Sequence, residues 1–243
     1  MHVRERGKGP RVVLVHGSVN GGDTWVAQEP LGARWRLVIP DRPGFGKSAA
    51  DGRPDFEREA APIAELLGDE AHLVGHSYGG VISLLAALER PEAVRSLTVV
   101  EPPCFSVARG DPAVDALVER LAEHWDHGPR DNPEAFLRGF LALVGITPDF
   151  PSPLPRWLER GARLLPDERR PWEAEIPLAE LDAAPFPKLV VSGGHHPAFD
   201  AVCDALATGL TAEVATISGV GHIIPRTGEP FNARLEAFLA CAP

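Results

Sequence analysis

The chain has 243 residues, 44% of them hydrophobic, which is enough for one sizeable core with at most a subdomain. Its formal net charge of −10 and the lack of any Lys/Arg cluster argue against a nucleic-acid partner. No apolar run has membrane-spanning length and the charged N-terminus has no signal-peptide pattern, so we expect no membrane partner. The three widely spaced cysteines predict free thiols in a reducing, cytoplasmic setting, with no metal and no cofactor.

Apolar runs of strand length recur along the chain and predict a central sheet. They lie at 12–17, 35–41, 71–77, 96–102, 188–194 and 212–219, and residues 2–6 can add one short edge strand. Helix-like segments separate most of these runs. Continuous apolar strands that alternate with helices are typical of an α/β protein, in which helices cover both faces of a mostly parallel sheet.

The stretch LVGHSYGGVIS, at 73–83, places a serine between small residues where a predicted strand meets a predicted helix. Ser77 stands in a G-x-S-x-G match with Gly75 and Gly79. Small residues at these positions let the chain cross itself closely while the serine adopts a strained backbone geometry. We therefore take Ser77 as a candidate nucleophile. An ordinary serine in a glycine-rich turn is the alternative.

The segment at 103–184 breaks the alternation and contains no convincing strand. Apolar residues recur there at helical spacing in three stripes, at Val114, Leu117, Val118 and Leu121, at Phe136, Phe140, Leu143 and Val144, and at Leu154, Trp157, Leu158 and Leu165. Three helices inserted after the strand that ends at Glu101 predict a helical lid, with simple peripheral packing as the alternative. The predicted organisation is a core at 1–102 and 185–243 and a lid at 103–184.

A serine hydroxyl needs a base that takes its proton and donors that face the developing negative charge. His222, in SGVGHIIP after the last predicted strand, is the candidate base. The candidate oxyanion donors are the backbone N–H groups of Tyr78, directly after the nucleophile, and of Ser18, in the loop HGSVNGGDTW. Ser18 could also be a plain loop residue. Four other histidines could lie near this site, namely His16, His76, His195 and His196.

Four motifs in this order, HGSVNGGDTW, DRPGFGKS, GHSYGG and GVGH, resemble the α/β-hydrolase superfamily over nearly the whole chain. Each motif is weak by itself, whereas the ordered set with its strand spacing is specific. The resemblance implies hydrolysis of an ester, lactone or thioester through an acyl-enzyme. It also implies a structural role at the pocket rim for Asp41, Gly44, Gly46 and Ser48.

The chain departs from this superfamily at the usual place of the catalytic acid. That place, after the strand before the histidine's strand, reads SGGHHPAFD and offers no carboxylate until Asp200, inside the next predicted helix. Glu101 is the better candidate, because it ends the strand that follows the nucleophile's helix, as the acid does in certain haloalkane dehalogenases and lactone hydrolases. A carboxylate there would fix the histidine tautomer and stabilise the imidazolium. Another carboxylate, or an incomplete triad, stays open.

These features together predict a serine hydrolase that cleaves an ester, lactone or thioester of a small to medium apolar substrate, with Ser77, His222 and Glu101 as the triad. A serine at position 77 argues against dehalogenase and epoxide-hydrolase chemistry, which in these families requires an aspartyl ester. A cofactor-free C–C hydrolase, lyase or cyclase and a non-catalytic ligand-binding homologue stay as alternatives. The expected partner is a small-molecule carbonyl substrate, and a homodimer is left open.

Overall fold

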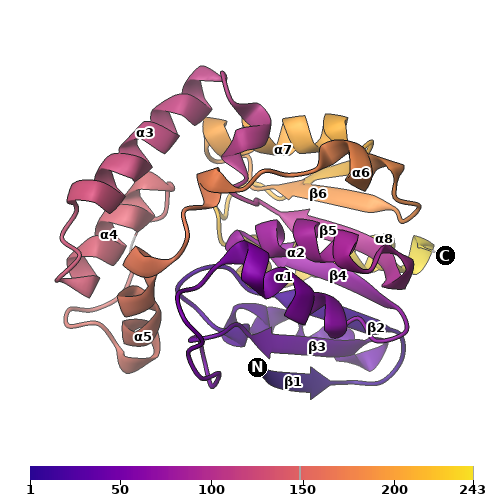
Figure 1. Ribbon diagram of the computed structural model, residues 1–243. Coiled ribbons are helices and arrows are strands. Elements are labelled where there is room, and N and C mark those ends of the chain that lie inside the picture. The colour runs from indigo at the N-terminus through magenta and orange to yellow at the C-terminus, as the bar shows by residue number, and fades with distance from the viewer. Residues whose placement is uncertain (148, 243) are drawn as a thin grey trace.

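The computed structural model describes residues 1–147 and 149–242, and its centre is a seven-stranded sheet in the order β1-β3-β2-β4-β5-β6-β7 (Figure 1). The strands are β1 (His2–Arg6), β2 (Arg11–Val15), β3 (Arg36–Asp41), β4 (Ala71–His76), β5 (Val94–Val100), β6 (Lys188–Ser192) and β7 (Glu213–Thr216). Only β1 runs antiparallel to its neighbour β3, and the other pairs are parallel. The predicted mostly parallel sheet is therefore confirmed.

Helices cover both faces of this sheet. They are α1 (Phe56–Glu65), α2 (Tyr78–Glu89), α3 (Pro112–His127), α4 (Pro133–Leu143), α5 (Arg156–Leu164), α6 (Leu178–Ala183), α7 (Pro197–Gly209) and α8 (Glu229–Cys241). Short 3₁₀ segments are η1 (Gly22–Ala33), η2 (Pro91–Ala93), η3 (Phe105–Ala108), η4 (Leu165–Asp167), η5 (Pro171–Glu173) and η6 (Ile224–Thr227). No helix in the described part of the chain is long and apolar enough to cross a bilayer.

The hydrophobic core has two layers, one on each face of the sheet. Val13 and Val15 of β2 belong to the apolar cluster that holds α1, α2 and α7. Val12 and Leu14 belong to the cluster on the opposite face, with residues of η1 and α8. Successive side chains of a strand point to opposite faces, so a continuous apolar strand is buried on both. This is why a strand such as β2 appears in the sequence as an unbroken run of apolar residues.

Residues 103–184, which we call the insert, hold helices and no strand among the residues that the structure describes. Asp111 caps α3 by accepting from the N–H groups of Ala113 and Val114, and Asn132 caps α4 by accepting from Ala135 N–H. In Figure 1 α3, α4 and α5 stand together beside one end of the sheet, whereas α6 returns to the core layer and packs near α2 and α7.

The insert forms hydrogen bonds with the loops at that end of the sheet and packs closely against them. Arg160 of α5 donates to the carbonyl oxygens of Gly46 (2.8 Å) and Ser48 (2.7 Å). Gly161 approaches the chain at Val19 so closely that a Cβ would lie 1.7 Å from the Val19 carbonyl oxygen.

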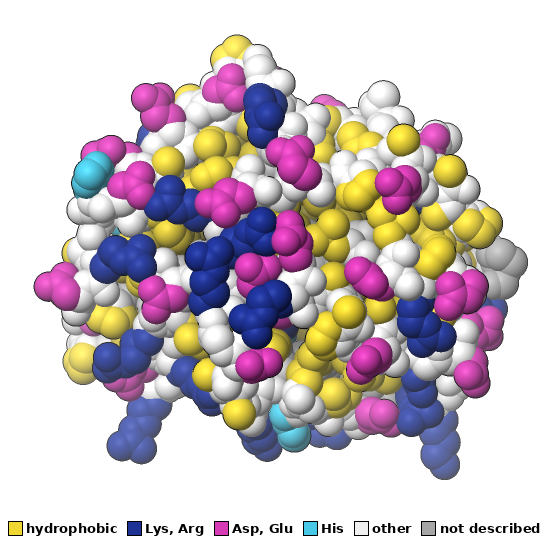
Figure 2. All heavy atoms as spheres, viewed as in Figure 1, with side chains coloured by type: hydrophobic (Ala, Val, Ile, Leu, Met, Phe, Trp, Pro, Cys, Tyr) yellow, Lys and Arg dark blue, Asp and Glu magenta, His cyan; other side chains and the backbone are white. Residues whose placement is uncertain are grey.

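Acidic and basic side chains are intermixed over the face seen in Figure 2.

The carboxyl ends of the parallel strands meet at one edge of the sheet and bring distant residues together. Gly17 follows β2, Arg42 follows β3, Ser77 follows β4 and Glu101 follows β5, while the loop after β7 holds His222. In open parallel sheets this edge is the usual place for a ligand. Helices α3, α4 and α5 of the insert stand beside the same edge, and Phe140 and Leu158 line a cavity together with Ser77.

Candidate active site

Ser77 occupies a sharp turn between β4 and α2. Its backbone angles are φ 53° and ψ −128°, a conformation that non-glycine residues rarely adopt. A Cβ at Gly79 would lie 2.4 Å from the carbonyl oxygens of both Val15 and His16, and a Cβ at Gly75 would lie 2.4 Å from the Gly79 carbonyl oxygen. The two glycines of the motif are therefore required by close backbone approach, as the sequence predicts.

Replacing Gly79 by alanine should lower the free energy of unfolding by about 1–3 kcal/mol, because the added methyl group meets rigid backbone atoms. Urea unfolding followed by circular dichroism measures this change. Gly32→Ala is the matched control, since its added Cβ comes no closer than 3.6 Å to a neighbouring atom and should change stability by less than about 1 kcal/mol. Equal losses in the two variants would contradict the explanation.

A continuous chain of hydrogen bonds joins Ser77, His222 and Glu101. The Ser77 Oγ lies 2.9 Å from His222 Nε2, and His222 Nδ1 lies 2.7 Å from Glu101 Oε2. All three side chains are buried. An ionised carboxylate can only accept, so Nδ1 carries the proton and Nε2 is free to accept the hydroxyl proton of Ser77.

The surroundings of Glu101 keep its carboxylate ionised. Burial by itself would raise its pKa, but hydrogen bonds from His195, His222 and the Gly193 N–H outweigh this and lower the pKa of Glu101 to about 2. The Gly193 N–H and His195 Nδ1 both donate to Oε1, at 2.6 and 3.2 Å, while Oε2 faces His222. The two oxygens therefore have different partners.

His195 is a further partner of Glu101, and no role for it was predicted from the sequence. Its Nε2 faces the Val144 carbonyl oxygen of the insert at 3.3 Å, while its Nδ1 faces Glu101. Both partners are acceptors, so a His195 that makes both bonds carries two protons, and the hydrogen bond to Glu101 raises its pKa. The doublet HHP after β6 is the available sequence signal, because it stands where the resemblance to the α/β-hydrolase superfamily predicts a catalytic acid.

The other carboxylate that the sequence offered, Asp200, lies in the first turn of α7. Its Oδ1 accepts from the Ser192 hydroxyl at 2.6 Å. The structure thus brings Glu101 to His222 and places Asp200 in a contact at the start of a helix.

Three further histidines form hydrogen bonds with backbone groups around the site. His76 Nε2 lies 2.8 Å from the His222 carbonyl oxygen and donates to it. Burial lowers the pKa of His76 to about 3, so this ring is neutral at neutral pH. His16 contacts Gly17 and the backbone of Arg42. His196 accepts from the Ala198 N–H as the N-cap of α7.

The loop that contains Gly17 and Ser18 passes directly over the serine. A Cβ at Gly17 would lie 2.8 Å from the Ser77 Cβ and 3.3 Å from its Oγ. Tyr78 is the first residue of α2, so its N–H has no acceptor within the helix. Ser18 and Tyr78 line one small cavity together with Ser77 and His222.

Two cavities meet at Ser77. The larger has a volume of about 190 Å³ and is lined on the side of the insert by Phe140, Ile146, Trp157 and Leu158. The smaller, of about 20 Å³, is close to the space that one water-sized group needs, and its walls include Phe105, Trp125, Phe199 and Glu168. Both cavities include Ser77 and His222 in their lining, so a molecule that occupies both would have its reacting bond near the nucleophile.

The loop DRPGFGKS has the contacts of a structural turn. Asp41 accepts from the backbone N–H groups of Gly22 (2.7 Å) and Lys47 (2.9 Å), and the Ser48 hydroxyl donates to the Asp41 carbonyl oxygen. A Cβ at Gly46 would lie within 2.4 Å of the Asp41 carboxylate. These contacts fit the structural role predicted for this loop.

Among the described residues, Glu101, His195 and His222 place ligand-type atoms within 4.8 Å of one another. Both nitrogens of His222 already face Ser77 and Glu101, and Glu101 already takes three donors. A metal ion there would have to break the contacts that link His222 to its partners. The donor set therefore fits an acid–base chain better than a metal centre.

A family model described as the alpha/beta hydrolase family matches residues 12–237. Among curated proteins, the chain is 38% identical over 107 residues to a pimeloyl-acyl-carrier-protein methyl ester esterase of Aeromonas hydrophila. That alignment covers 42% of this chain and 42% of the esterase, so it spans less than half the length of this relative.

Solved structures match over nearly the whole chain. A membrane phospholipase A is 26% identical with a TM-score of 0.72, over 98% of this chain and 81% of its own. An N-acyl homoserine lactone degrading enzyme is 22% identical with a TM-score of 0.67, over 98% of this chain and 96% of its own, a likeness that shows the fold alone. Because the family model spans most of the sequence, the chain belongs to the alpha/beta hydrolase family.

Proposed function

We propose that this protein is a serine hydrolase that cleaves esters, lactones or thioesters of small to medium apolar substrates, with Ser77, His222 and Glu101 as its catalytic triad. The observation that carries the proposal is the pair of contacts at His222, 2.9 Å to the Ser77 hydroxyl and 2.7 Å to the Glu101 carboxylate. This chain of contacts ends at the junction of two apolar cavities. Nucleophile, base and orienting acid are the parts that acyl transfer by a serine requires.

The proposed reaction proceeds through an acyl-enzyme. His222 Nε2 takes the Ser77 proton as Oγ attacks the substrate carbonyl carbon, and the carbonyl oxygen becomes an oxyanion that the N–H groups of Ser18 and Tyr78 face. Glu101 holds Nδ1–H and stabilises the imidazolium. The bond to the leaving group then breaks as His222 returns the proton to it. Water, deprotonated by His222, repeats the sequence on the acyl-enzyme and releases the acid.

The unequal cavities support a substrate with one short part. The curated relative named above is a methyl ester esterase, which likewise acts on an ester with a short alcohol part. We propose that the part of the ester held in the cavity of about 20 Å³ is limited to one or two carbons, while the cavity of about 190 Å³ takes the longer, apolar part. A panel that varies acyl and alcohol length independently tests this, and esters long on both sides should react slowest.

Covalent labelling tests the proposed function. A fluorophosphonate should add once per chain, and peptide mass spectrometry should place the adduct on Ser77, because this hydroxyl faces a base in an open cavity. Ser218→Ala, which removes an exposed loop hydroxyl, should label like wild type. Folded protein that takes no label would instead support a non-catalytic ligand-binding role.

Oxygen labelling separates hydrolysis from lyase or cyclase chemistry at the same site. In ¹⁸O-enriched water, the proposed mechanism places one ¹⁸O atom in the carboxylic acid product of each turnover. A product that forms without solvent oxygen would favour the lyase or cyclase alternative.

A further inference from the structure

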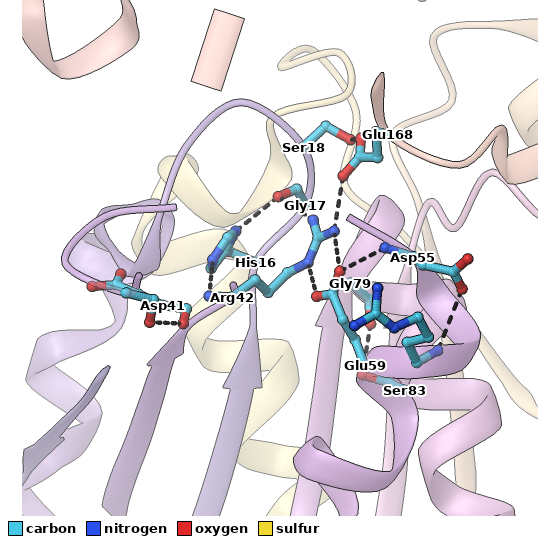
Figure 3. Close-up of polar contacts among 12 residues, drawn as sticks. His16, Gly17, Ser18, Asp41, Arg42, Asp55, Glu59, Gly79, Ser83 and Glu168 are labelled. Atoms are coloured by element: carbon cyan, nitrogen blue, oxygen red, sulfur yellow. Dashed lines mark hydrogen bonds and ion pairs between the residues drawn. The ribbon is translucent and has the colours of Figure 1, made fainter. Parts of the chain in front are cut away.

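A fully buried guanidinium lies next to the loop that covers Ser77 (Figure 3). Arg42 Nε and Nη2 donate to the two oxygens of Glu59 at 2.7 and 3.1 Å, and Nη2 also donates to Glu168 Oε1 at 2.8 Å. Its remaining nitrogen, Nη1, donates to the Gly17 carbonyl oxygen at 3.0 Å. Burial would lower the pKa of Arg42, but the two carboxylates outweigh burial and raise it, so the group is charged.

His16 donates to the same carbonyl oxygen. Its Nε2 lies 2.9 Å from the Arg42 backbone N–H, which can only donate, so Nε2 is the acceptor and Nδ1 carries the proton. Nδ1–H then donates to the Gly17 carbonyl oxygen at 2.8 Å. Burial lowers the pKa of His16 well below its usual range, in agreement with a neutral ring. The Gly17 carbonyl oxygen therefore accepts two hydrogen bonds, one from a cation.

The Gly17 carbonyl and the Ser18 N–H belong to one peptide unit. Because the unit is planar and trans, its carbonyl and N–H point in opposite directions, and holding the carbonyl holds the N–H. A hydrogen bond from a charged donor also polarises the peptide unit and strengthens its N–H as a donor. By holding the Gly17 carbonyl oxygen, the buried side chains of Arg42 and His16 thus fix the orientation of the Ser18 N–H. In the proposed mechanism this N–H donates to the oxyanion.

The insert supplies a second anchor for this loop. The Ser18 hydroxyl donates to Glu168 Oε2, while Oε1 of the same carboxylate accepts from Arg42. Glu168 directly follows η4 of the insert, so it joins the insert to the loop over Ser77. Burial raises the pKa of the Glu168 carboxyl, and Arg42 and the Ser18 hydroxyl act in the opposite direction. One carboxylate therefore holds both the side chain of Ser18 and the guanidinium behind it.

We propose that Arg42 and His16 are positioning residues that hold the Gly17–Ser18 peptide unit with its N–H toward the substrate oxyanion, and that Glu168 ties this arrangement to the insert. The inference rests on the proposed function. It assigns a role in transition-state stabilisation to three buried side chains that touch no reacting atom. Their loss should therefore affect the charged intermediate more than the bound substrate.

Kinetics of Arg42→Lys and Glu168→Gln test the proposal with the best ester from the panel. Lysine keeps the charge but cannot reach Glu59, Glu168 and the Gly17 carbonyl oxygen together, and we expect kcat to fall about 10²-fold with KM within about threefold, as for loss of one oxyanion donor. In Glu168→Gln the new amide has one acceptor oxygen where the carboxylate had two, so we expect kcat to fall about tenfold. Arg169→Met is the matched control, because Arg169 belongs to the insert but pairs with Asp55 and Glu57.

Inhibitor binding separates positioning from a merely structural effect. A trifluoromethyl ketone forms an anionic adduct with a serine nucleophile, so its Ki should rise by the same factor by which kcat/KM falls, whereas the Ki of an uncharged methyl ketone of the same shape should stay within about threefold. Folded Arg42→Lys and Glu168→Gln proteins with unchanged kcat, or equal changes in the two Ki values, would overturn the proposal. If Arg42→Lys does not fold, Glu168→Gln alone decides. Wild type that neither turns over esters nor labels would instead overturn the proposed function.

Discussion

Replacing Ser77 by alanine should lower kcat for a cleaved ester by roughly 10⁴-fold or more, because the acyl-enzyme can no longer form. The remaining activity would come from binding and from the oxyanion donors alone. Steady-state kinetics with carefully purified protein measures the loss, and circular dichroism confirms that the variant is folded. A Ser77→Ala protein with normal activity would show that another group attacks the substrate.

The same position offers a test of stability that is independent of activity. The φ of 53° at Ser77 is strained for any side chain with a Cβ, so Ser77→Gly should be more stable than Ser77→Ala by about 1 kcal/mol. The order should reverse at Ser83, in the interior of α2, where glycine costs about 1 kcal/mol relative to alanine. Urea unfolding of the four variants measures both differences. An unchanged order at the two positions would mean that the turn stores no strain.

Changing Glu101 to glutamine should lower kcat by about 10⁴-fold, although the two side chains have the same shape. Oε1 of Glu101 accepts from two donors, the Gly193 N–H and His195, so the amide oxygen of the glutamine should occupy that place. Its NH₂ group then faces His222 Nδ1 and must donate to it. This reverses the tautomer of His222, and Nε2 can no longer accept the Ser77 proton.

Asp200→Asn is the matched control for this prediction, because it makes the same chemical change at the other carboxylate near the site. Its carboxylate accepts from Ser192 in the structure, so kcat should stay within about threefold. The pKa of Glu101, about 2, also means that the carboxylate remains ionised at all pH values above about 3, so the loss in Glu101→Gln should persist across the neutral range. A large loss in Asp200→Asn with little effect at Glu101 would assign the acid to α7.

Local patterns were sufficient for most of the sheet and for the nucleophile turn. Apolar runs predicted six strands, and the described strands lie within or close to them. The signal is clearest for a strand such as β4, which is buried at every position and therefore needs apolar side chains along most of its length, whereas β7 is largely exposed. The 3₁₀ segment at Gly22–Ala33 was not predicted, since its apolar residues have no helical period and Pro30 interrupts it.

In the candidate site, too, local sequence was sufficient to predict some residues and not others. Ser77 could be chosen from the sequence because its glycines record a backbone requirement of the turn itself, and His222 because of its glycine context in the loop after the last strand. Residue type did not separate Glu101 from Asp200, and the sequence favoured Glu101 only by its place directly at the end of a predicted strand. Only the three-dimensional arrangement places one carboxylate 2.7 Å from His222 and the other against Ser192.

The sequence by itself determined the positions of most strands along the chain, the glycine-flanked serine and the late histidine, because each of these is encoded in a short stretch of chain. The tertiary structure decided the partners of the buried charges: Glu101 with His222 and His195, and Arg42 with Glu168 and the Gly17 carbonyl oxygen. These contacts join residues that lie up to 126 positions apart, and a buried charge takes whichever partner the packing of the sheet and the insert brings within reach. A local sequence pattern carries no information about contacts between residues that lie so far apart in the chain.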